Sequence, residues 1–236
     1  MKMNLRSQTK QIKIGNITIG GSNKVLIQSM CNIKTSKVDE VVKQINECAL
    51  LGADLMRVSV LDMEDAKAIK EIVSKISIPL IADIHFDYHL AIESINSGVS
   101  AVRLNPGNIG SEVNVKQVVE LCKEKHIPIR IGVNSGSIDE EVNNNTKVVN
   151  AEELVESAEK MTQILEKYGF YDIVISLKGS HVQETIDAYR LAAEKFKYPL
   201  HLGITEAGPK DIGLIRSTAG IAPLLLDGIG DRKSVV

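Results

Sequence analysis

The sequence predicts an α/β fold, a TIM-type (β/α) barrel, on three observations. Short segments of alternating apolar and polar residues recur seven times, and a helical pattern follows each of them. The links between them are mostly short, which favours right-handed crossovers and a parallel sheet. The polar face of each strand argues against helices on both sides of the sheet, because such strands are apolar throughout. The length of 236 residues is close to the ~250 of a single barrel.

A β-hairpin is expected ahead of the repeats. Residues 11–21, QIKIGNITIGG, alternate between apolar and polar side chains and carry Gly-Asn at a turn position. A barrel needs a cover over one end of its interior, and a hairpin before the first strand is suited to that task. A frayed N-terminal arm is the alternative interpretation.

Seven strands follow, and each opposes an apolar face to a polar one. The clearest lies within 127–137, IPIRIGVNSGS, where one face carries Ile129, Ile131 and Val133 and the other carries Arg130, Gly132 and Asn134. The other six lie at 25–30, 54–60, 79–85, 101–105, 172–178 and 200–205. Since helices cover only the outer face of a barrel, the polar faces are expected to point into its interior.

Seven helices are expected, at 37–50, 63–75, 88–97, 113–125, 151–168, 181–196 and 210–226. Gly52, Gly98 and Gly169 follow three of them, where a helix C-cap needs a left-handed residue. The link after Asn134 is long and rich in Asn and acidic residues, which suits either a lid or a solvated insertion. The chain then ends in RKSVV, a poor core strand, so the sequence predicts a barrel truncated before its eighth strand.

Composition limits the classes of function. A formal charge of -2 gives no reason to expect nucleic-acid or membrane affinity, and the absence of Trp weighs against base stacking. No apolar run is long enough to cross a bilayer, and the N-terminus lacks an apolar signal core. Cys31, Cys48 and Cys122 are widely spaced, which indicates neither disulfides nor a local metal site. We therefore expect one cytoplasmic barrel domain over 1–236, with no nucleic-acid or membrane partner.

Polar residues gather near the carboxyl ends of the predicted strands, where barrel active sites lie. Four of them are cations: Arg57, Arg103, Arg130 and Lys178. Unpaired buried charges are costly, and Asp83 with Glu206 cannot neutralise four cations, so an anionic ligand with several charges is expected. The planar guanidinium suits phosphate oxygens, which favours a diphosphate over a single carboxylate. Because the four cations share one facing and one end, an anionic site is favoured over structural ion pairs. The remaining inward candidates are His85, Asn105, Asn134, Ser176, His201 and Thr205.

Two acidic positions suggest chemistry. Asp83 and His85 share one face, two residues apart, which fits either a metal-ligand pair or an acid/base relay. The sequence offers no convincing third ligand, so we expect no metal in this chain. Glu206 ends a strand among cations and is the candidate for general acid/base catalysis, with a salt-bridge role as the alternative.

Eight motifs together resemble one family, the 4-hydroxy-3-methylbut-2-enyl diphosphate synthases of the methylerythritol phosphate route to isoprenoids. They are IQSM at 27–30, MRVSV at 56–60, ADIHF at 82–86, VRLNPGNIG at 102–110, IRIGVNSGS at 129–137, SLKGS at 176–180, HLGITEAG at 201–208 and LLLDGIGD at 224–231. The resemblance is to the N-terminal barrel domain of the family and runs from the hairpin to about residue 231.

The resemblance implies a reaction and roles for residues. The family converts 2-C-methyl-D-erythritol 2,4-cyclodiphosphate to the enyl diphosphate by a two-electron reductive ring opening with loss of water. It implies that Glu206 assists protonation or dehydration and that Asp83 and His85 lie in the pocket. It also implies diphosphate binding by the residues Arg57, Arg103, Arg130 and Lys178, with Asn105 and Asn134 beside them. The origin implied is bacterial or plastid.

The resemblance further implies components outside this chain. In the family, electrons pass from flavodoxin or ferredoxin to a 4Fe–4S cluster, held by three Cys and a Glu of a C-terminal domain in a head-to-tail homodimer. None of the three cysteines here falls at a cluster position, and the family's eighth strand, with an Arg and a Ser at the diphosphate, is expected to be missing. We therefore expect this chain alone to be inactive. A pterin-binding transferase similar to dihydropteroate synthase and a non-catalytic anion-binding fragment are the alternatives.

Overall fold

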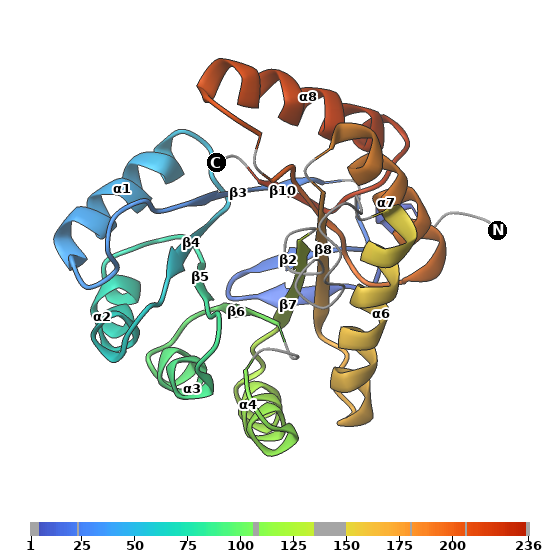
Figure 1. The fold of residues 1–236 in the computed structure, drawn as a ribbon. Helices are drawn as coiled ribbons and strands as arrows, with labels where there is room; N and C mark the ends of the chain where they lie inside the picture. The colour runs from blue at the N-terminus through green and yellow to red at the C-terminus, as the bar shows by residue number, and fades with distance from the viewer. Residues whose placement is uncertain are drawn as a thin grey trace.

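Eight parallel strands form the centre of the computed structural model, which describes residues 5–22, 24–105, 109–134, 150–179, 181–205 and 207–234 (Figure 1). Their order in the sheet is β8-β7-β6-β5-β4-β3-β10-β9. The strands are β3 (Leu26–Met30), β4 (Leu55–Ser59), β5 (Leu80–Asp83), β6 (Ala101–Leu104), β7 (Ile129–Asn134), β8 (Ile173–Lys178), β9 (His201–Leu202) and β10 (Arg232–Ser234). The predicted (β/α) barrel is confirmed.

Helices surround this sheet on its outer side (Figure 1). They are α1 (Val38–Leu50), α2 (Met63–Ser74), α3 (Tyr88–Asn96), α4 (Glu112–Lys125), α6 (Ala151–Lys167), α7 (Val182–Lys195) and α8 (Lys210–Leu226). Every predicted helix is found within one residue of its expected bounds. Gly52, Gly98 and Gly169 have positive φ, as predicted for residues that end a helix. The link at 135–149, predicted as a lid or an insertion, lies outside the described residues.

Alternation along the strands builds two separate cores. The outward residues, such as Met56, Val58 and Ile131, pack with the helices in the larger core. The inward residues near the amino ends of the strands form a second, smaller apolar layer: Leu26, Leu55, Ile81, Ala101 and Val174. The interior is therefore apolar at its lower end and polar at the carboxyl ends of the strands.

The hairpin covers the lower end of the barrel. Strands β1 (Ile12–Ile14) and β2 (Ile17–Ile19) pair antiparallel, and Ile12, Ile14 and Ile19 pack against the lower apolar layer. Ile14 is completely buried. The prediction that this hairpin closes the barrel is confirmed, and the alternative of a frayed arm is wrong.

The expected truncation before the eighth strand is wrong. Arg232–Ser234 forms β10, which pairs parallel with β3 on one side and with β9 on the other. In this strand Arg232 and Ser234 share one face, with Lys233 between them, so its inward side carries only polar groups. The strand therefore lacks the apolar residues by which strands are usually found in a sequence.

The ring closes at a narrow seam between β8 and β9. An isolated parallel bridge joins Ile175 to Leu200, and Tyr189 of α7 is fully buried beside it. The Tyr189 hydroxyl accepts from Leu177 N at 3.1 Å and donates to the carbonyl oxygen of His201. A side-chain hydroxyl thus links two strands where the ladder of backbone hydrogen bonds is short.

The N-terminal segment is joined to the last turn and strand of the described chain. Arg6 donates to the carbonyl oxygens of Leu225 at 2.7 Å and Gly230 at 3.0 Å. Thr9 donates to the Asp231 carboxylate at 2.6 Å. None of the helices in the described ranges is long and apolar enough to cross a membrane.

Candidate anion-binding site

Five cationic side chains lie at inward positions of the barrel wall. The register places Asp83 of β5 opposite Arg103 of β6, and Arg103 opposite Arg130 of β7. The cations are Arg57 on β4, Arg103 on β6, Arg130 on β7, Lys178 on β8 and Arg232 on β10. The sequence predicted the first four of them as one group, and the structure brings them together.

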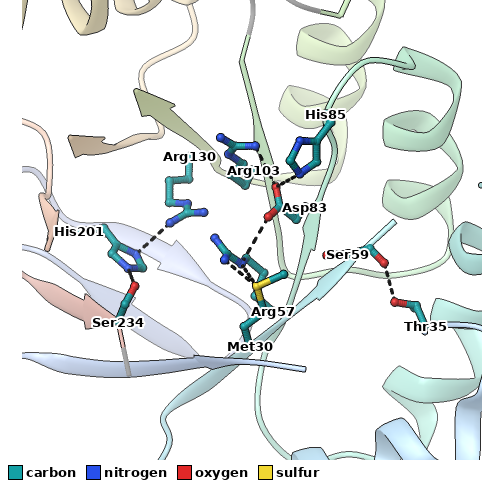
Figure 2. A network of polar contacts seen from close by, with 10 residues as sticks. All are labelled: Met30, Thr35, Arg57, Ser59, Asp83, His85, Arg103, Arg130, His201 and Ser234. Atoms are coloured by element: carbon teal, nitrogen blue, oxygen red, sulfur yellow. Dashed lines mark hydrogen bonds and ion pairs between the residues drawn. The ribbon is translucent and has the colours of Figure 1, made fainter. Parts of the chain in front are cut away.

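Asp83 is the centre of one half of the cluster (Figure 2). Arg103 Nη1 donates to Asp83 Oδ1 at 3.2 Å, and Arg57 Nε lies 3.4 Å from Oδ2. His85 Nε2 lies 3.6 Å from the same Oδ1. Burial opposes ionisation of Asp83, but the nearby guanidinium groups, Arg57 first, outweigh it and lower its pKa. The carboxylate is therefore ionised and shared between two arginines.

Arg57 has a second and weaker partner. Its Nε lies 3.2 Å from the Met30 sulfur, a poor hydrogen-bond acceptor (Figure 2). Burial lowers the pKa of Arg57, and Asp83 opposes that shift. Arg57 thus faces a thioether and a carboxylate that it shares with Arg103, so its buried positive charge is poorly neutralised. This leaves the guanidinium available to an anionic ligand.

His201 is the centre of the other half. Its Nδ1 faces Arg130 Nη1 at 3.4 Å and accepts from Arg232 Nε at 2.6 Å. Its Nε2 lies 2.6 Å from Ser234 Oγ, as Figure 2 shows. Arg130 Nε and both terminal nitrogens of Arg232 are buried without a hydrogen-bond partner among the described residues. These nitrogen atoms have unused donors inside the barrel.

The cations perturb one another. Burial, together with the charges of Arg130, Arg57 and Arg103, lowers the pKa of Lys178 to about 7. Burial and Arg57 lower the pKa of Arg232 to about 9, and burial with neighbouring cations, Arg57 and Arg232 first, holds that of Arg130 well below its usual value. Burial is the largest cause of these shifts and repulsion between the cations adds to it, as expected where an anion completes the site.

Two glycines make room for these side chains. A Cβ atom at Gly132 would lie 3.0 Å from Arg103 Nε, and one at Gly203 would lie 2.9 Å from Lys178 Cε. Both glycines occupy inward positions, so any larger residue there would displace a cation. The small residues in IRIGVN and HLGIT are part of the site for this reason.

The other predicted site residues divide into three groups. Asn105 and Ser176 are buried in the wall, and Asn134 ends β7 beside Lys178 of β8, with which it is in register. Thr205 lines a cavity of about 770 Å³ between α8 and the ends of β9 and β10, which Ser234 and Lys233 also line. Glu206, the predicted catalytic acid/base, lies outside the described residues.

The described residues offer no ligand set for a metal or an iron–sulfur cluster. No three His, Cys, Asp or Glu side chains within the described ranges come close enough to hold an ion. Cys31 and Cys122 are buried, and burial raises the pKa of the Cys31 thiol to about 12. The Asp83 oxygens face guanidinium groups, which favours the acid/base interpretation of Asp83 and His85 over a metal-ligand pair.

Sequence reasoning missed Arg232 and Ser234 as residues of this site. The signal was present, because R-K-S puts an Arg and a Ser two residues apart on one face of a strand after GIGD. That is the pair which the family resemblance expects in the eighth strand. The contribution of Met30 was also missed, since a thioether beside a guanidinium has no sequence pattern.

The fold and site define a parallel (β/α) barrel with a cluster of cationic side chains on its inner wall. The model of the GcpE TIM-barrel domain matches residues 9–235, and the chain belongs to this family. The match continues past residue 231, where the resemblance was expected to end, and includes β10.

Curated relatives agree with this assignment. The chain is 54% identical over 230 residues to the 4-hydroxy-3-methylbut-2-en-1-yl diphosphate synthase (flavodoxin) of Clostridium perfringens, covering 98% of the chain and 66% of the relative. It is 55% identical over 231 residues to that of Caldanaerobacter subterraneus, covering 98% of the chain and 65% of the relative. The chain thus spans about two thirds of the length of these relatives.

Among solved structures, dihydropteroate synthases share the fold. The enzyme from Stenotrophomonas maltophilia superimposes with a TM-score of 0.71 at 12% identity, covering 96% of this chain and 92% of that one. The enzyme from Thermus thermophilus gives 0.71 at 12%, covering 96% and 93%. At this level of identity the likeness shows the barrel fold alone.

Proposed function

We propose that this chain is the substrate-binding barrel of a reductase that converts 2-C-methyl-D-erythritol 2,4-cyclodiphosphate to 4-hydroxy-3-methylbut-2-enyl diphosphate. The observation that carries the proposal is the cluster of five inward cations, of which Asp83 contacts two, Arg57 and Arg103. The relatives at 54% and 55% identity are named for that product, which supports the same substrate class.

In this proposal the cluster binds the two phosphoryl groups. Arg57 and Arg103 are joined through Asp83 on one side of the barrel interior, and Arg130 and Arg232 through His201 on the other. Lys178 interacts electrostatically with both halves, because the charges of Arg130, Arg57 and Arg103 all lower its pKa. Guanidinium forks bind phosphate oxygens in pairs, so the cluster orients the ring as well as holding it.

The remaining site residues would complete the substrate site. Asn105, Asn134, Ser176 and Thr205 are proposed to contact the substrate, and Glu206 to transfer the proton that accompanies loss of water. Asp83 with His85 would hold the arginines and relay a proton at the cavity wall. The reaction is a two-electron reduction, and the described residues supply neither a cluster site nor another electron carrier. The 4Fe–4S cluster, the flavodoxin or ferredoxin donor and the homodimer therefore belong to the longer protein that the family resemblance implies.

Calorimetric titration tests the proposal. The chain is titrated with the cyclodiphosphate and, in parallel, with a pterin, which is the ligand expected if the transferase alternative were correct. We expect binding of the cyclodiphosphate, weakened by Arg130→Ala and unchanged by Arg216→Ala, an exposed arginine of α8. Binding of the pterin in preference would replace the proposal, and binding of neither ligand would overturn it.

A second measurement addresses Glu206. In a longer relative that carries the whole enzyme, replacement of the matching Glu by Gln is expected to keep binding of the cyclodiphosphate and to lose most turnover. Near wild-type turnover would remove this residue from the proposed mechanism. This measurement does not depend on whether the present chain is active alone.

A further inference from the structure

His201 contacts three polar side chains of the site and is itself completely buried. Its position on β9 is fixed from behind, because the Tyr189 hydroxyl donates to its carbonyl oxygen. Its ring reaches Arg232 and Ser234 on β10 and Arg130 on β7. Figure 2 shows the ring between Arg130 and Ser234.

The contacts assign the protons of the ring. A guanidinium nitrogen can only donate, so Nδ1, which faces Arg232 and Arg130, must be the unprotonated acceptor. The proton of the neutral ring is then on Nε2, which donates to Ser234 Oγ at 2.6 Å. Burial and the charges of Arg232 and Arg130 lower the pKa of His201 well below its usual value, which agrees with a neutral ring.

This arrangement has a consequence for two neighbours. Ser234 Oγ accepts from His201, so the hydroxyl proton of Ser234 is directed to another partner. Arg232 uses Nε on His201, which leaves its two terminal nitrogens buried without a partner in the described part of the chain. A neutral acceptor at this place lets two arginines approach one another without a carboxylate that would compete with an anionic ligand.

We propose that His201 is a positioning residue, which holds Arg232 and Ser234 with their free donors directed at the diphosphate while remaining neutral itself. The proposal rests on the proposed function, since the diphosphate is the ligand of that function. It assigns His201 no proton transfer in the reaction. It also explains why a histidine rather than an acidic residue serves here: a carboxylate would neutralise Arg232 permanently.

Two substitutions separate the two hydrogen bonds. In His201→Asn the amide oxygen replaces Nδ1 as an acceptor for Arg232 but cannot reach Ser234. In His201→Gln the amide nitrogen replaces Nε2 as a donor to Ser234, and the acceptor for Arg232 is lost. His181→Asn, at an exposed histidine, is the control. Each chain is titrated with inorganic diphosphate and with the cyclodiphosphate by calorimetry.

We expect His201→Gln to bind either ligand roughly tenfold to a hundredfold more weakly, the range for loss of a hydrogen bond to a charged group. His201→Asn, which loses only the bond to the neutral Ser234, should bind roughly twofold to tenfold more weakly. The control should bind like the wild type. Unchanged binding in both His201 variants, with a wild type that binds, would overturn the role of His201 and leave the proposed function intact. A wild type that binds neither ligand would overturn both.

Nitrogen NMR of the wild-type chain gives a readout that does not depend on the folding of a variant. We expect the His201 ring to show the Nε2–H form from pH 5.5 to 8, with no titration, both free and with diphosphate. Protonation of Nδ1 within this range would overturn the proposal, because a charged ring cannot accept from Arg232.

In the binding experiment, wild-type-like binding in His201→Asn alone would assign the role to Arg232 without Ser234.

Discussion

Arg103 and Asp83 occupy paired positions on β6 and β5, and Arg103 donates to the Asp83 carboxylate at 3.2 Å. The same carboxylate also serves Arg57, so one negative charge is divided between two guanidinium groups. The other half of the cluster has a neutral histidine in the equivalent role. The barrel interior around these groups is therefore positively charged, and the stability and anion affinity of the protein should depend strongly on each of them.

Asp83→Asn should lower the free energy of unfolding by roughly 3–5 kcal/mol without ligand, because loss of one partner leaves buried charge uncompensated. Inorganic diphosphate should restore part of that loss. Urea unfolding with and without the anion measures both effects.

The control for Asp83 is Asp172→Asn, which breaks an exposed pair with Lys10. An exposed pair contributes about 0–1 kcal/mol. Equal effects of the two substitutions would show that the Asp83 cluster is not energetically special.

Lys178→Met should stabilise the protein most at low pH. The pKa of Lys178 is about 7 in the fold against 10.5 ordinarily, so between these values the unfolded chain binds the extra proton and stability rises with pH. Below pH 7 the folded protein carries the unfavourable charge, which methionine removes. The advantage of the variant should therefore fall from pH 7 toward pH 10, by at most about 1.4 kcal/mol per pH unit.

The free energy of unfolding of both proteins is measured at four pH values between about 6 and 10. A shift of one pKa unit corresponds to about 1.4 kcal/mol. Because the difference between the two free energies of unfolding is used, the contributions of groups that titrate alike in both proteins cancel. An advantage that grows with pH would contradict the assigned direction of the Lys178 shift.

Arg232→Met should leave stability unchanged or raise it by about 1–4 kcal/mol, because an unpaired buried cation is replaced by an apolar side chain of similar length. The same change should weaken binding of inorganic diphosphate roughly tenfold or more. Arg216→Met, at an exposed position of α8, is the control and should keep the affinity. Lower stability together with normal binding would show a structural role for Arg232 instead.

Ile14→Ala should cost roughly 2–5 kcal/mol of stability, since Ile14 is fully buried under the barrel. Ile17→Ala, at a partly buried position of the same hairpin, should cost clearly less. Diphosphate affinity should be near normal in both, because the hairpin is at the end of the barrel opposite the cluster. Equal losses of stability in the two variants would show that the hairpin does not close the barrel as its packing indicates.

Alternation within single strands was enough to predict most of the wall. Met56 against Arg57, and Ile131 against Arg130, were assigned to the correct faces because helices contribute apolar contacts on one side only. Helix ends were predicted well where glycine marks them, as at Gly52. His126, with φ of 56°, ends α4 in the left-handed region without such a mark.

β10 could not be found by the same rule. Its outward residue, Lys233, lines the cavity beside α8 instead of packing in the helix-covered core, so no apolar residue signals the strand. The neutral role of His201 was also beyond the sequence, because it depends on two guanidinium groups from strands far apart in the chain. A sequence shows which residues are charged, but it does not show that Arg130 and Arg232 face the same acceptor, His201 Nδ1, in the folded barrel.

The contact of Arg6 with the carbonyl of Leu225 joins residues 219 positions apart, and it bears on how the chain reaches its native state. During translation the hairpin is made before the barrel strands, yet its apolar layer draws on strands up to Val174, and Thr9 meets Asp231 only when residue 231 has been made. Contacts of such long range slow folding and leave apolar surface exposed meanwhile. The hairpin therefore cannot complete its packing until the residues up to Asp231 have been made.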